Sequence, residues 1–259
     1  MTERQVVFVG AGPGDPDLIT VKGKMALERA DVVVYAGSLV NRELLADLKP
    51  DAQSHDSASL TLDEAVTIMV AAVDQGKKVV RLHTGDPSLY GAIQEQIEAL
   101  AERDIKTIVI PGVTAAFAAA ASLGQELTLP GVSQTVILTR VEGRTPVPEK
   151  EQLSKIAALG ATTCLYLSVG MMEKVVSELL AGGVFTPMTP VAVVSRASWA
   201  DELIVEGTLA DIAARVEAAG LTRQALIIVG EALAARAQGV GEKSKLYDAG
   251  FAHGFRNRR

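Results

Sequence analysis

The sequence predicts an α/β fold made of two α/β domains with mostly parallel sheets. Short apolar runs rich in β-branched residues alternate with helical patterns, and this alternation is typical of parallel sheets. A length of 259 residues fits one large or two modest domains. Hydrophobic residues make up 48% of the chain and aromatic residues only 4%. We therefore expect a large core built mainly from Val, Leu, Ile and Ala.

The first half of the chain reads as one complete layer of strands and helices. Thr61 and Glu64 have the spacing of a capping box, and Thr20 and Asn41 can cap two earlier helices. The predicted strands span residues 5–9, 31–35, 79–83 and 106–110. The predicted helices span residues 21–30, 41–47, 61–74, 90–100 and 115–123.

A break in the pattern divides the chain. We predict an N-terminal domain over residues 1–123, a Gly- and Pro-containing linker over 124–132, a C-terminal domain over 133–236 and a polar, basic tail over 237–259. In the second domain, strands are predicted at residues 134–139, 162–167, 190–194, 202–206 and 225–229. Helices are predicted at residues 150–159, 171–180 and 211–219.

The stretch Val79–Ala92, V-V-R-L-H-T-G-D-P-S-L-Y-G-A, is predicted to form a strand, a tight loop and the start of a helix. Ligands of open α/β sheets bind outside the carboxyl ends of the strands, so this loop faces the expected ligand crevice. Gly85 lets the backbone approach a ligand closely, Asp86 offers an acceptor and Pro87 fixes the turn. His83 is expected to pack at the end of the strand.

The start of the helix 115–123 is a second candidate for ligand binding. Thr114 can cap this helix, and the backbone N–H groups at its start could hold a carboxylate. The alternative, that the alanines of this helix serve only close packing, is equally consistent with the sequence.

Composition argues against several other classes of function. The net charge of −6 argues against a general nucleic-acid or membrane-surface binder. The apolar run 115–123 is far shorter than the roughly 20 residues of a membrane span. Cys164 is the only cysteine, so neither a disulfide within the chain nor a cysteine metal site is possible, and we expect it to be buried in a strand. No metal site is expected, and the protein should be soluble and cytoplasmic.

The first glycine-rich loop does not match a dinucleotide-binding site. Gly10 and Gly12 begin a G-x-G-x-x-G pattern, but Asp15 stands where the third glycine belongs. The next strand also ends in Y-A-G-S, without the acidic residue that would hold a ribose. No glycine-lysine P-loop is present, so binding of a dinucleotide or hydrolysis of a nucleotide triphosphate is disfavoured.

Three motifs resemble those of a known family. They are V-G-A-G-P-G-D-P-D-L-I-T from Val9, T-G-D-P-S-L-Y-G-A from Thr84 and P-G-V-T-A from Pro111. With these motifs the chain resembles the tetrapyrrole methylases, S-adenosylmethionine-dependent enzymes with two α/β domains and a cofactor cleft between them. The resemblance covers almost the whole chain.

Further stretches are similar to the subgroup of this family that methylates carbon 11 of a corrin-ring precursor. They are Y-A-G-S-L-V from Tyr35, H-D-S-A-S-L-T from His55, S-Q-T-V-I-L-T-R-V-E-G-R-T-P-V-P from Ser133 and the ending S-K-L-Y-D-A-G-F-A-H-G-F-R from Ser244. The resemblance implies a C-methyltransferase of cobalamin biosynthesis, acting as a homodimer on a tetrapyrrole. Two alternatives stay open. One is methylation of uroporphyrinogen or another macrocycle, and the other is a non-catalytic module that binds S-adenosylmethionine.

The resemblance also implies a set of site residues. S-adenosylmethionine, which leaves as S-adenosylhomocysteine, would be bound by Pro13, Thr84, Gly85, Asp86, Tyr90, Thr114, Ala115, Tyr166, Leu167, Ala197, Ala225 and Leu226. From sequence alone, ordinary core strand residues are the favoured interpretation of the 166–167 and 225–226 pairs. Gly14 would face the macrocycle, and its carboxylates would meet one or more of Arg140, Arg144 and Arg196, because bidentate arginine is their natural partner. Taken singly, each of these arginines is better explained as solvated surface.

The implied reaction is attack by an electron-rich ring carbon on the methyl group of a sulfonium. It needs alignment and exclusion of water, and no covalent nucleophile. Asp15 and His55 are the candidates to accept a proton.

Overall fold

The computed structural model describes residues 4–235, together with residues 239, 241, 242, 244, 245, 250–252 and 254. Most of the predicted tail 237–259 lies outside these residues. Contacts divide the chain into two compact units. The first consists of Met1–Ala118 with Ser198–Asp201, and the second of Ala119–Ala197 with Glu202–Arg259. The sequence-based boundaries, with a linker at 124–132, remain a prediction.

The first unit is built on a five-stranded sheet in the order β3-β2-β4-β1-β5, and all of its strand pairs are parallel. Its strands are β1 (Gln5–Gly10), β2 (Val32–Tyr35), β3 (Gln53–Asp56), β4 (Val79–His83) and β5 (Lys106–Ile110). The sequence analysis missed β3, whose residues Q-S-H-D are mostly exposed at the sheet edge. An edge strand needs no apolar pattern because little of it is buried.

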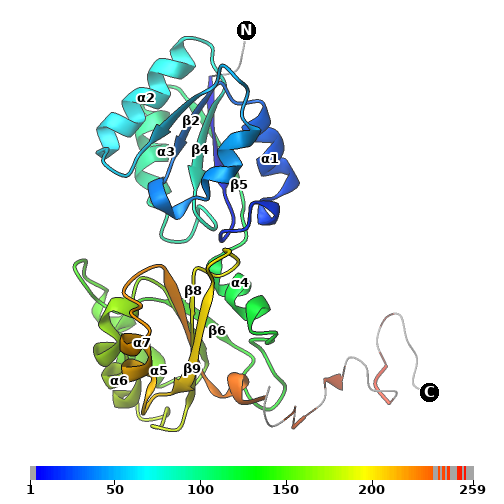
Figure 1. Ribbon diagram of the computed structural model, residues 1–259, viewed down its shortest axis with the longest axis vertical. Coiled ribbons are helices and arrows are strands. Elements are labelled where there is room, and N and C mark those ends of the chain that lie inside the picture. The colour runs from blue at the N-terminus through cyan, green and yellow to red at the C-terminus, as the bar shows by residue number, and fades with distance from the viewer. Residues whose placement is uncertain are drawn as a thin grey trace. The chain divides into compact units, whose positions relative to one another are not determined.

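Helices cover both faces of this first sheet, as Figure 1 shows for α2 and α3 on one side and α1 on the other. Its α-helices are α1 (Val21–Glu28), α2 (Leu62–Asp74) and α3 (Ile93–Ala101), and its 3-10 helices are η1 (Pro16–Leu18), η2 (Gly37–Leu39) and η3 (Arg42–Asp47). The next helix, α4 (Ala115–Ser122), begins in the first unit and continues past its last residue, Ala118, into the second. The predicted capping box at α2 is confirmed: the Glu64 amide donates to Thr61 Oγ1, and the Thr61 amide donates to Glu64 Oε2. α3 begins later than predicted because Tyr90 and Ala92 adopt left-handed φ angles of 56° and 47°.

The second unit is built on a sheet in the order β6-β7-β10-β8-β9, and only its β6–β7 pair is parallel. The expectation of mostly parallel sheets is therefore correct for the first sheet and wrong for the second. The strands are β6 (Val136–Thr139), β7 (Thr162–Leu165), β8 (Pro190–Ser195), β9 (Leu203–Thr208) and β10 (Ala225–Val229). The connection 196–202 between β8 and β9 is too short for the crossover that parallel neighbours require.

Helices α5 (Leu153–Ala157), α6 (Met172–Ala181) and α7 (Ile212–Ala218) pack on one face of the second sheet around a core that includes Leu165, Val193 and Ile227 (Figure 1). Three 3-10 helices, η4 (Glu149–Glu151), η5 (Val169–Met171) and η6 (Glu231–Ala234), lie in the connections. The expected burial of Cys164 in a strand is confirmed, and burial raises the pKa of its thiol to about 12. No helix in the described part of the chain is both long and apolar enough to cross a membrane.

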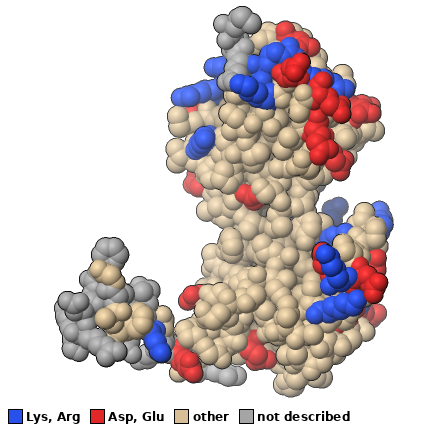
Figure 2. All heavy atoms as spheres, turned by 180° about the vertical axis from the view of Figure 1, so that it is seen from behind, with Lys and Arg blue, Asp and Glu red and all other residues tan. Residues whose placement is uncertain are grey.

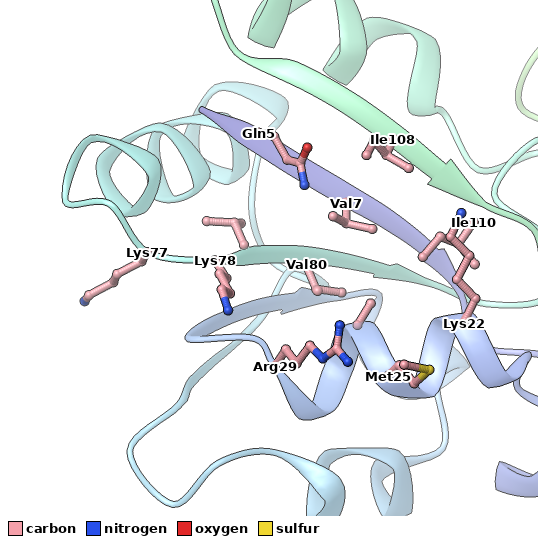
Figure 3. Close-up of a pocket in the computed structure, with 12 residues that line it drawn as sticks. Gln5, Val7, Lys22, Met25, Arg29, Lys77, Lys78, Val80, Ile108 and Ile110 are labelled. Carbon is pink, nitrogen blue, oxygen red and sulfur yellow. The ribbon is translucent and has the colours of Figure 1, made fainter. Parts of the chain in front are cut away.

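One face of the first sheet is open between α1 and β5, where it forms a groove of about 500 Å³ (Figure 3). Its apolar floor includes Val7, Val80 and Ile108, and basic side chains such as Lys22 and Arg29 stand at its rim. None of the predicted site residues lines this groove. On the face of the molecule in Figure 2, charges of both signs lie side by side on each unit.

The other face of the same sheet buries two basic side chains of β4. The Arg81 guanidinium donates to Gln96 Oε1 at 2.9 Å and to the Val34 carbonyl at 3.1 Å, and burial lowers its pKa to about 10. His83 stacks on Phe8 with ring centroids 5.8 Å apart, which confirms its expected packing. Its Nε2 is buried without a hydrogen-bond partner. Burial, and secondarily the charge of Arg81, lower the pKa of His83 to about 3.

This histidine makes stability depend on pH. Below the ordinary His pKa of 6.5, the unfolded chain binds a proton that folded His83 accepts only near pH 3, so the free energy of unfolding decreases as the pH falls through this window. At pH 5.5 the expected loss from this group is on the order of 1 kcal/mol.

Urea denaturation at pH 7.5 and 5.5 checks this, followed by the fluorescence of Trp199, the only tryptophan, which belongs to the first unit. His83→Phe should lose less stability than the wild type between the two pH values. Equal losses in the two proteins would contradict the assignment.

Candidate functional site

Three loops of the first unit meet at the carboxyl ends of neighbouring strands. Residues 11–15 follow β1, residues 84–92 follow β4 and residues 111–114 follow β5. Strand β1 pairs in parallel with both β4 and β5, so the three loops leave the sheet at the same edge. In open α/β sheets this edge is where ligands bind.

The loops approach one another so closely that a side chain would collide with neighbouring backbone at two positions, Gly10 and Gly112. A Cβ on Gly10 would lie 2.6 Å from the Cα of Gly112. A Cβ on Gly112 would overlap the carbonyl oxygen of Gly85 and lie 2.9 Å from the Cα of Gly10. All of these neighbours are backbone atoms, which cannot rotate away. Gly10, Gly85 and Gly112 therefore form a junction, here called the glycine junction, that brings together the three motifs found in the sequence.

Backbone hydrogen bonds join the first two loops at this junction. The Gly85 amide donates to the Gly12 carbonyl at 2.8 Å, and the Gly12 amide donates to the Gly85 carbonyl at 3.2 Å. Gly12 and Gly85 have φ angles of 79° and 58°, which favour glycine. The Ala11 amide donates to the His83 carbonyl at 2.7 Å. The geometry of each loop thus depends on the other.

Asp86 ties the third loop to the second. Its Oδ2 accepts from the Gly112 amide at 2.9 Å, and its Oδ1 accepts from the Ser88 amide at 2.8 Å. Sequence reasoning foresaw an acceptor at Asp86 but not these two backbone partners, because the first of them comes from a distant loop. The role of Asp86 as a cofactor contact stays a prediction.

Thr84, Gly85 and Asp86 lie beside the start of α4. A Cβ on Gly85 would have only the Cα of Thr114 and the carbonyl oxygen of Val113 within 4 Å, at 3.8 and 3.9 Å, so the space beside this glycine is open. The Thr114 carbonyl accepts from the Phe117 amide at 3.1 Å and begins the helix that contains Ala115. Predicted cofactor residues from two motifs are thus neighbours.

Tyr90 lies further along the second loop and is 45% exposed. The loop bends sharply here, since a Cβ on Gly91 would overlap the Pro87 carbonyl oxygen. Gln96 of α3 holds the last residue of this loop, because its Nε2 donates to the Ala92 carbonyl at 3.1 Å. Its Oε1 in turn accepts from Arg81.

The first loop places Pro13, Gly14 and Asp15 side by side. Asp15 caps η1, because its Oδ1 accepts from the Asp17 amide at 2.9 Å. From one side, Asn41 Nδ2 donates to the Gly14 carbonyl at 3.0 Å. Sequence reasoning did not identify Asn41 as a partner of this loop.

Two residues from the connection between β8 and β9 also hold this loop. Trp199 Nε1 donates to the Pro13 carbonyl at 2.9 Å, and the Asp15 amide donates to Ser198 Oγ at 3.0 Å. Sequence reasoning missed both residues. The only available signal was the presence of the single tryptophan in a short turn after a strand.

His55 is not placed beside Asp15. It lies on the edge strand β3, and β2 and β4 separate that strand from β1. Among the described residues no hydrogen bond joins His55 and Asp15. The proposed role of each in proton transfer stays a prediction.

The remaining predicted cofactor residues gather at one end of the second sheet. Leu226 pairs with Val194 in β8, and the Tyr166 amide donates to the Thr139 carbonyl at 2.8 Å at the ends of β6 and β7. Leu226 is 3% exposed, whereas Leu167 is 70% exposed with a left-handed φ of 54°. The members of this group are Tyr166, Leu167, Ala197, Ala225 and Leu226.

The three predicted substrate arginines differ in how they are engaged. Arg140 donates through Nη1 to the Thr145 carbonyl at 3.1 Å and through Nη2 to the Pro146 carbonyl at 2.7 Å, so it shapes its own loop. Arg196 Nη1 donates to Gln224 Oε1 at 3.4 Å. Arg144 is exposed.

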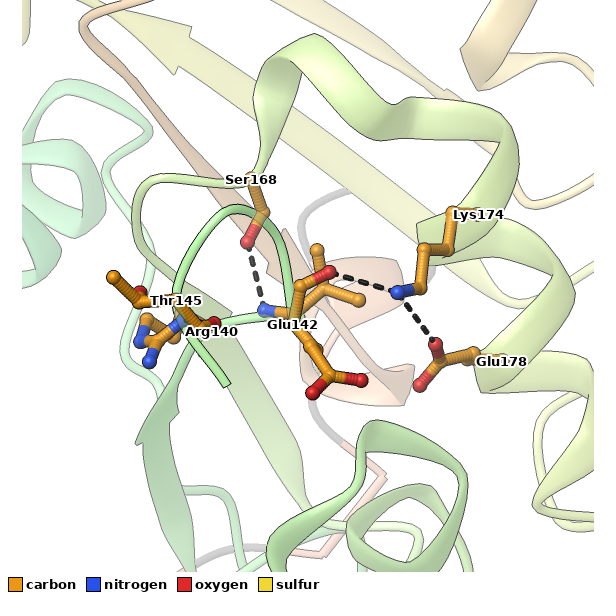
Figure 4. A network of polar contacts seen from close by, with 7 residues as sticks. Arg140, Glu142, Thr145, Ser168, Lys174 and Glu178 are labelled. Atoms are coloured by element: carbon orange, nitrogen blue, oxygen red, sulfur yellow. Dashed lines mark hydrogen bonds and ion pairs between the residues drawn. The ribbon is translucent and has the colours of Figure 1, made fainter. Parts of the chain in front are cut away.

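The loop that carries Arg140 and Arg144 is anchored at its start by Ser168, whose Oγ accepts from the Val141 amide at 2.9 Å (Figure 4). The same Oγ donates to the Tyr166 carbonyl at 2.7 Å. Lys174 Nζ donates to the Glu142 carbonyl at 2.7 Å and lies 3.7 Å from Glu178 Oε1. Within the described residues, no group of three His, Cys, Asp or Glu side chains could hold a metal ion.

Comparisons with known proteins agree on one family. The family model described as Tetrapyrrole (Corrin/Porphyrin) Methylases matches residues 5–213. A cobalt-precorrin-4 C(11)-methyltransferase of Methanocaldococcus jannaschii is 57% identical over 253 residues, covering 98% of this chain and 96% of the relative.

Solved structures agree with this. The X-ray structure of a cobalt precorrin-4 methyltransferase superposes with a TM-score of 0.87 and 48% identity, covering 89% of this chain and 96% of that one. A uroporphyrin-III C-methyl transferase of Thermus thermophilus, complexed with S-adenosyl homocysteine, matches with a TM-score of 0.73 and 30% identity, covering 88% and 93% of the two chains.

The two hydrogen bonds of Asp86 generate a stability prediction. Asp86→Asn retains one carbonyl oxygen but turns an N–H₂ group toward one of the two backbone donors, so either the bond to Gly112 or the bond to Ser88 is lost. We expect the free energy of unfolding to fall by roughly 1–3 kcal/mol.

Urea denaturation followed by Trp199 fluorescence measures it, with Asp51→Asn as the matched control, because Asp51 is exposed and makes no hydrogen bond through its side chain among the described residues. Equal midpoints for the two variants would contradict the prediction that the hydrogen bonds of Asp86 stabilise the fold.

Proposed function

The chain belongs to the tetrapyrrole (corrin/porphyrin) methylases, and from this premise we propose that it transfers the methyl group of S-adenosylmethionine to carbon 11 of precorrin-4 or cobalt-precorrin-4. The observation that carries the proposal is the high identity, over nearly the whole chain, to a relative named for that reaction. The cofactor is supported by the family and by the related uroporphyrin-III enzyme that binds S-adenosyl homocysteine.

The residues of the first unit fit one end of such a cofactor. Gly85 has no side chain, and the space beside it is open. Val113 and the start of α4 border this space. Thr84, Asp86, Thr114 and Ala115 would hold the amino-acid end, with backbone amides suited to a carboxylate. Pro13 and Tyr90 of the same unit would contribute further contacts, and the group from Tyr166 to Leu226 would hold the adenosine end.

When bound, the cofactor supplies an electrophilic methyl group and a neutral thioether leaving group. The chain's own residues then need only bind, orient and exclude water. Alignment of reactants can lower a barrier by roughly 7–11 kcal/mol when the positions are fixed. The glycine junction suits this task because its backbone contacts leave the three loops little freedom relative to one another.

Substrate carboxylates would be bound mainly by arginine. Arg144 is exposed and free to turn toward a ligand, whereas the guanidinium of Arg140 holds carbonyls of its own loop. Gly14 and Arg196 complete the predicted substrate contacts. By resemblance to the family we also propose a homodimer that acts in the cytoplasm.

A methyl-transfer assay tests the function. Mass spectrometry and NMR follow the product formed from labelled S-adenosylmethionine with precorrin-4, with its cobalt form and with uroporphyrinogen. One labelled methyl group at carbon 11 of precorrin-4 or its cobalt form is the expected result. Labelling of uroporphyrinogen alone would show that this chain is a uroporphyrinogen methyltransferase and not a precorrin-4 methyltransferase. Cofactor binding with no labelling would leave a binding module.

Asp15 is the candidate proton acceptor in the first loop, and its capping role requires a control. Asp15→Asn retains the Oδ that caps η1 but removes the carboxylate, whereas Asp15→Ala removes both. If the carboxylate accepts a proton, both variants should lose roughly 10²–10⁴-fold in kcat while binding of S-adenosylhomocysteine changes little.

Turnover and calorimetry on the same preparations check this. Recovery of wild-type kcat in Asp15→Asn would show that Asp15 serves only as a cap. Equal losses of turnover and cofactor affinity would instead assign the loop to the cofactor.

A further inference from the structure

Four residues from the second half of the chain belong, by their contacts, to the first unit. The segment Ser198–Asp201 connects β8 to β9, yet it groups with Met1–Ala118 and not with the two strands it joins. Arg196 and Ser198 on this connection have left-handed φ angles of 50° and 69°. The backbone therefore leaves the hairpin in an uncommon conformation before it reaches the first loop.

The segment contacts three consecutive residues of that loop. Trp199 Nε1 donates to the Pro13 carbonyl at 2.9 Å, and the Asp15 amide donates to Ser198 Oγ at 3.0 Å. Between these two bonds the α-carbon of Gly14 faces the indole. A Cβ built on Gly14 would overlap Cδ1 and Nε1 of Trp199 and lie 2.7 Å from its Cγ.

Trp199 is the reason why residue 14 has no side chain. Gly14 does not have a positive φ angle, so its backbone conformation is open to other residues. The three atoms nearest to its missing Cβ all belong to the indole. Indole and loop therefore fit each other directly, and on the opposite side Asn41 holds the Gly14 carbonyl.

We propose that Trp199 is a positioning residue for methyl transfer, which holds Pro13, Gly14 and Asp15 where the reaction needs them. This inference rests on the proposed function, in which these three residues meet the cofactor, the substrate and the proton. Trp199 acts through the loop and not on the reacting atoms. Small displacements of aligned groups reduce rates strongly, so loosening the loop should affect turnover first.

Cofactor binding should suffer less than turnover, because Trp199 donates to only one of the predicted cofactor residues named above, Pro13. Thr84, Gly85 and Asp86 are held by the glycine junction and by the bond between Asp86 and Gly112, none of which involves Trp199. Gly14 and Asp15, by contrast, depend on Trp199 and Ser198. The two halves of the site should therefore separate in a kinetic experiment.

The first test compares Trp199→Leu with Trp199→Phe. The leucine variant loses both the ring and the N–H donor, and kcat should fall roughly 10²-fold while the Kd of S-adenosylhomocysteine changes less than about threefold. The phenylalanine variant keeps a ring against Gly14 and should recover part of kcat. Circular dichroism establishes that each variant is folded. A folded leucine variant with wild-type kcat would overturn the proposal, as would equal losses in kcat and cofactor affinity.

The second test is a double-mutant cycle between Gly14 and Trp199. Gly14→Ala in the wild type forces the new methyl group against the indole, so it should lower kcat and shift the tryptophan emission. In a Trp199→Ala background the same substitution has room and should cost little further. Gly241→Ala is the matched control, because no atom of the described residues lies within 4 Å of its added Cβ. Equal effects of Gly14→Ala in both backgrounds would overturn the proposal.

These measurements separate failure of this inference from failure of the proposed function. Two measurements report the contact with Gly14 without any turnover. One is the emission of Trp199, the only tryptophan, in the wild-type background. The other is the coupling in unfolding free energy, followed by circular dichroism because the Trp199→Ala background has no tryptophan. A wild type without methyl transfer would sink the proposed function, and the positioning role would fall with it even if the coupling were found. An active wild type with no coupling and unchanged variants would sink the positioning role alone.

Discussion

The backbone contact between Gly10, Gly85 and Gly112 is the constraint on which the rest of the first unit depends. Three chains can meet at this distance only if no side chain stands between them. This requires β4, β1 and β5 to be neighbours, which is their order in the sheet. The paired amides of Gly12 and Gly85, and the carboxylate of Asp86, then fix the loops that leave these strands. The candidate site is made of loops, and it is held by close backbone contacts together with a few side-chain hydrogen bonds.

A buried polar side chain of β4 also stabilises the second loop. The Arg81 guanidinium is buried and bonds neutral acceptors on Gln96 and Val34, and Gln96 in turn holds the Ala92 carbonyl at the end of the second loop. A buried cation is costly unless its donors are satisfied. The same strand therefore supports the loop at its start through glycine contacts and at its end through a chain of hydrogen bonds.

The sequence predicted most of what is local. Runs of β-branched residues located β1, β2, β4, β5 and the strands of the second unit, and the spacing of Thr61 and Glu64 located the start of α2. It missed β3 because a polar edge strand has no apolar period, and it placed the start of α3 too early because left-handed residues are not visible in composition. Strand direction in the second sheet depends on which strands become neighbours, and no local pattern encodes this.

For the candidate site, the glycine motifs identified the three loops. The partners of Pro13 and Asp15 lie far away in the chain, and Trp199 comes 186 positions after Pro13.

The excursion of Ser198–Asp201 into the first unit has a consequence for how such a protein could be divided or recombined. A fragment that ended at the unit boundary, after Ala118, would contain the whole first sheet but would lack the indole and the hydroxyl that hold its first loop. The second fragment would contain Trp199 in the connection between β8 and β9 but would lack Pro13 and Gly14, the residues that Trp199 contacts. The two halves are thus not interchangeable modules. Exchange of either half between relatives would need to preserve a glycine in one and a tryptophan in the other, so the pair is expected to be inherited as a unit.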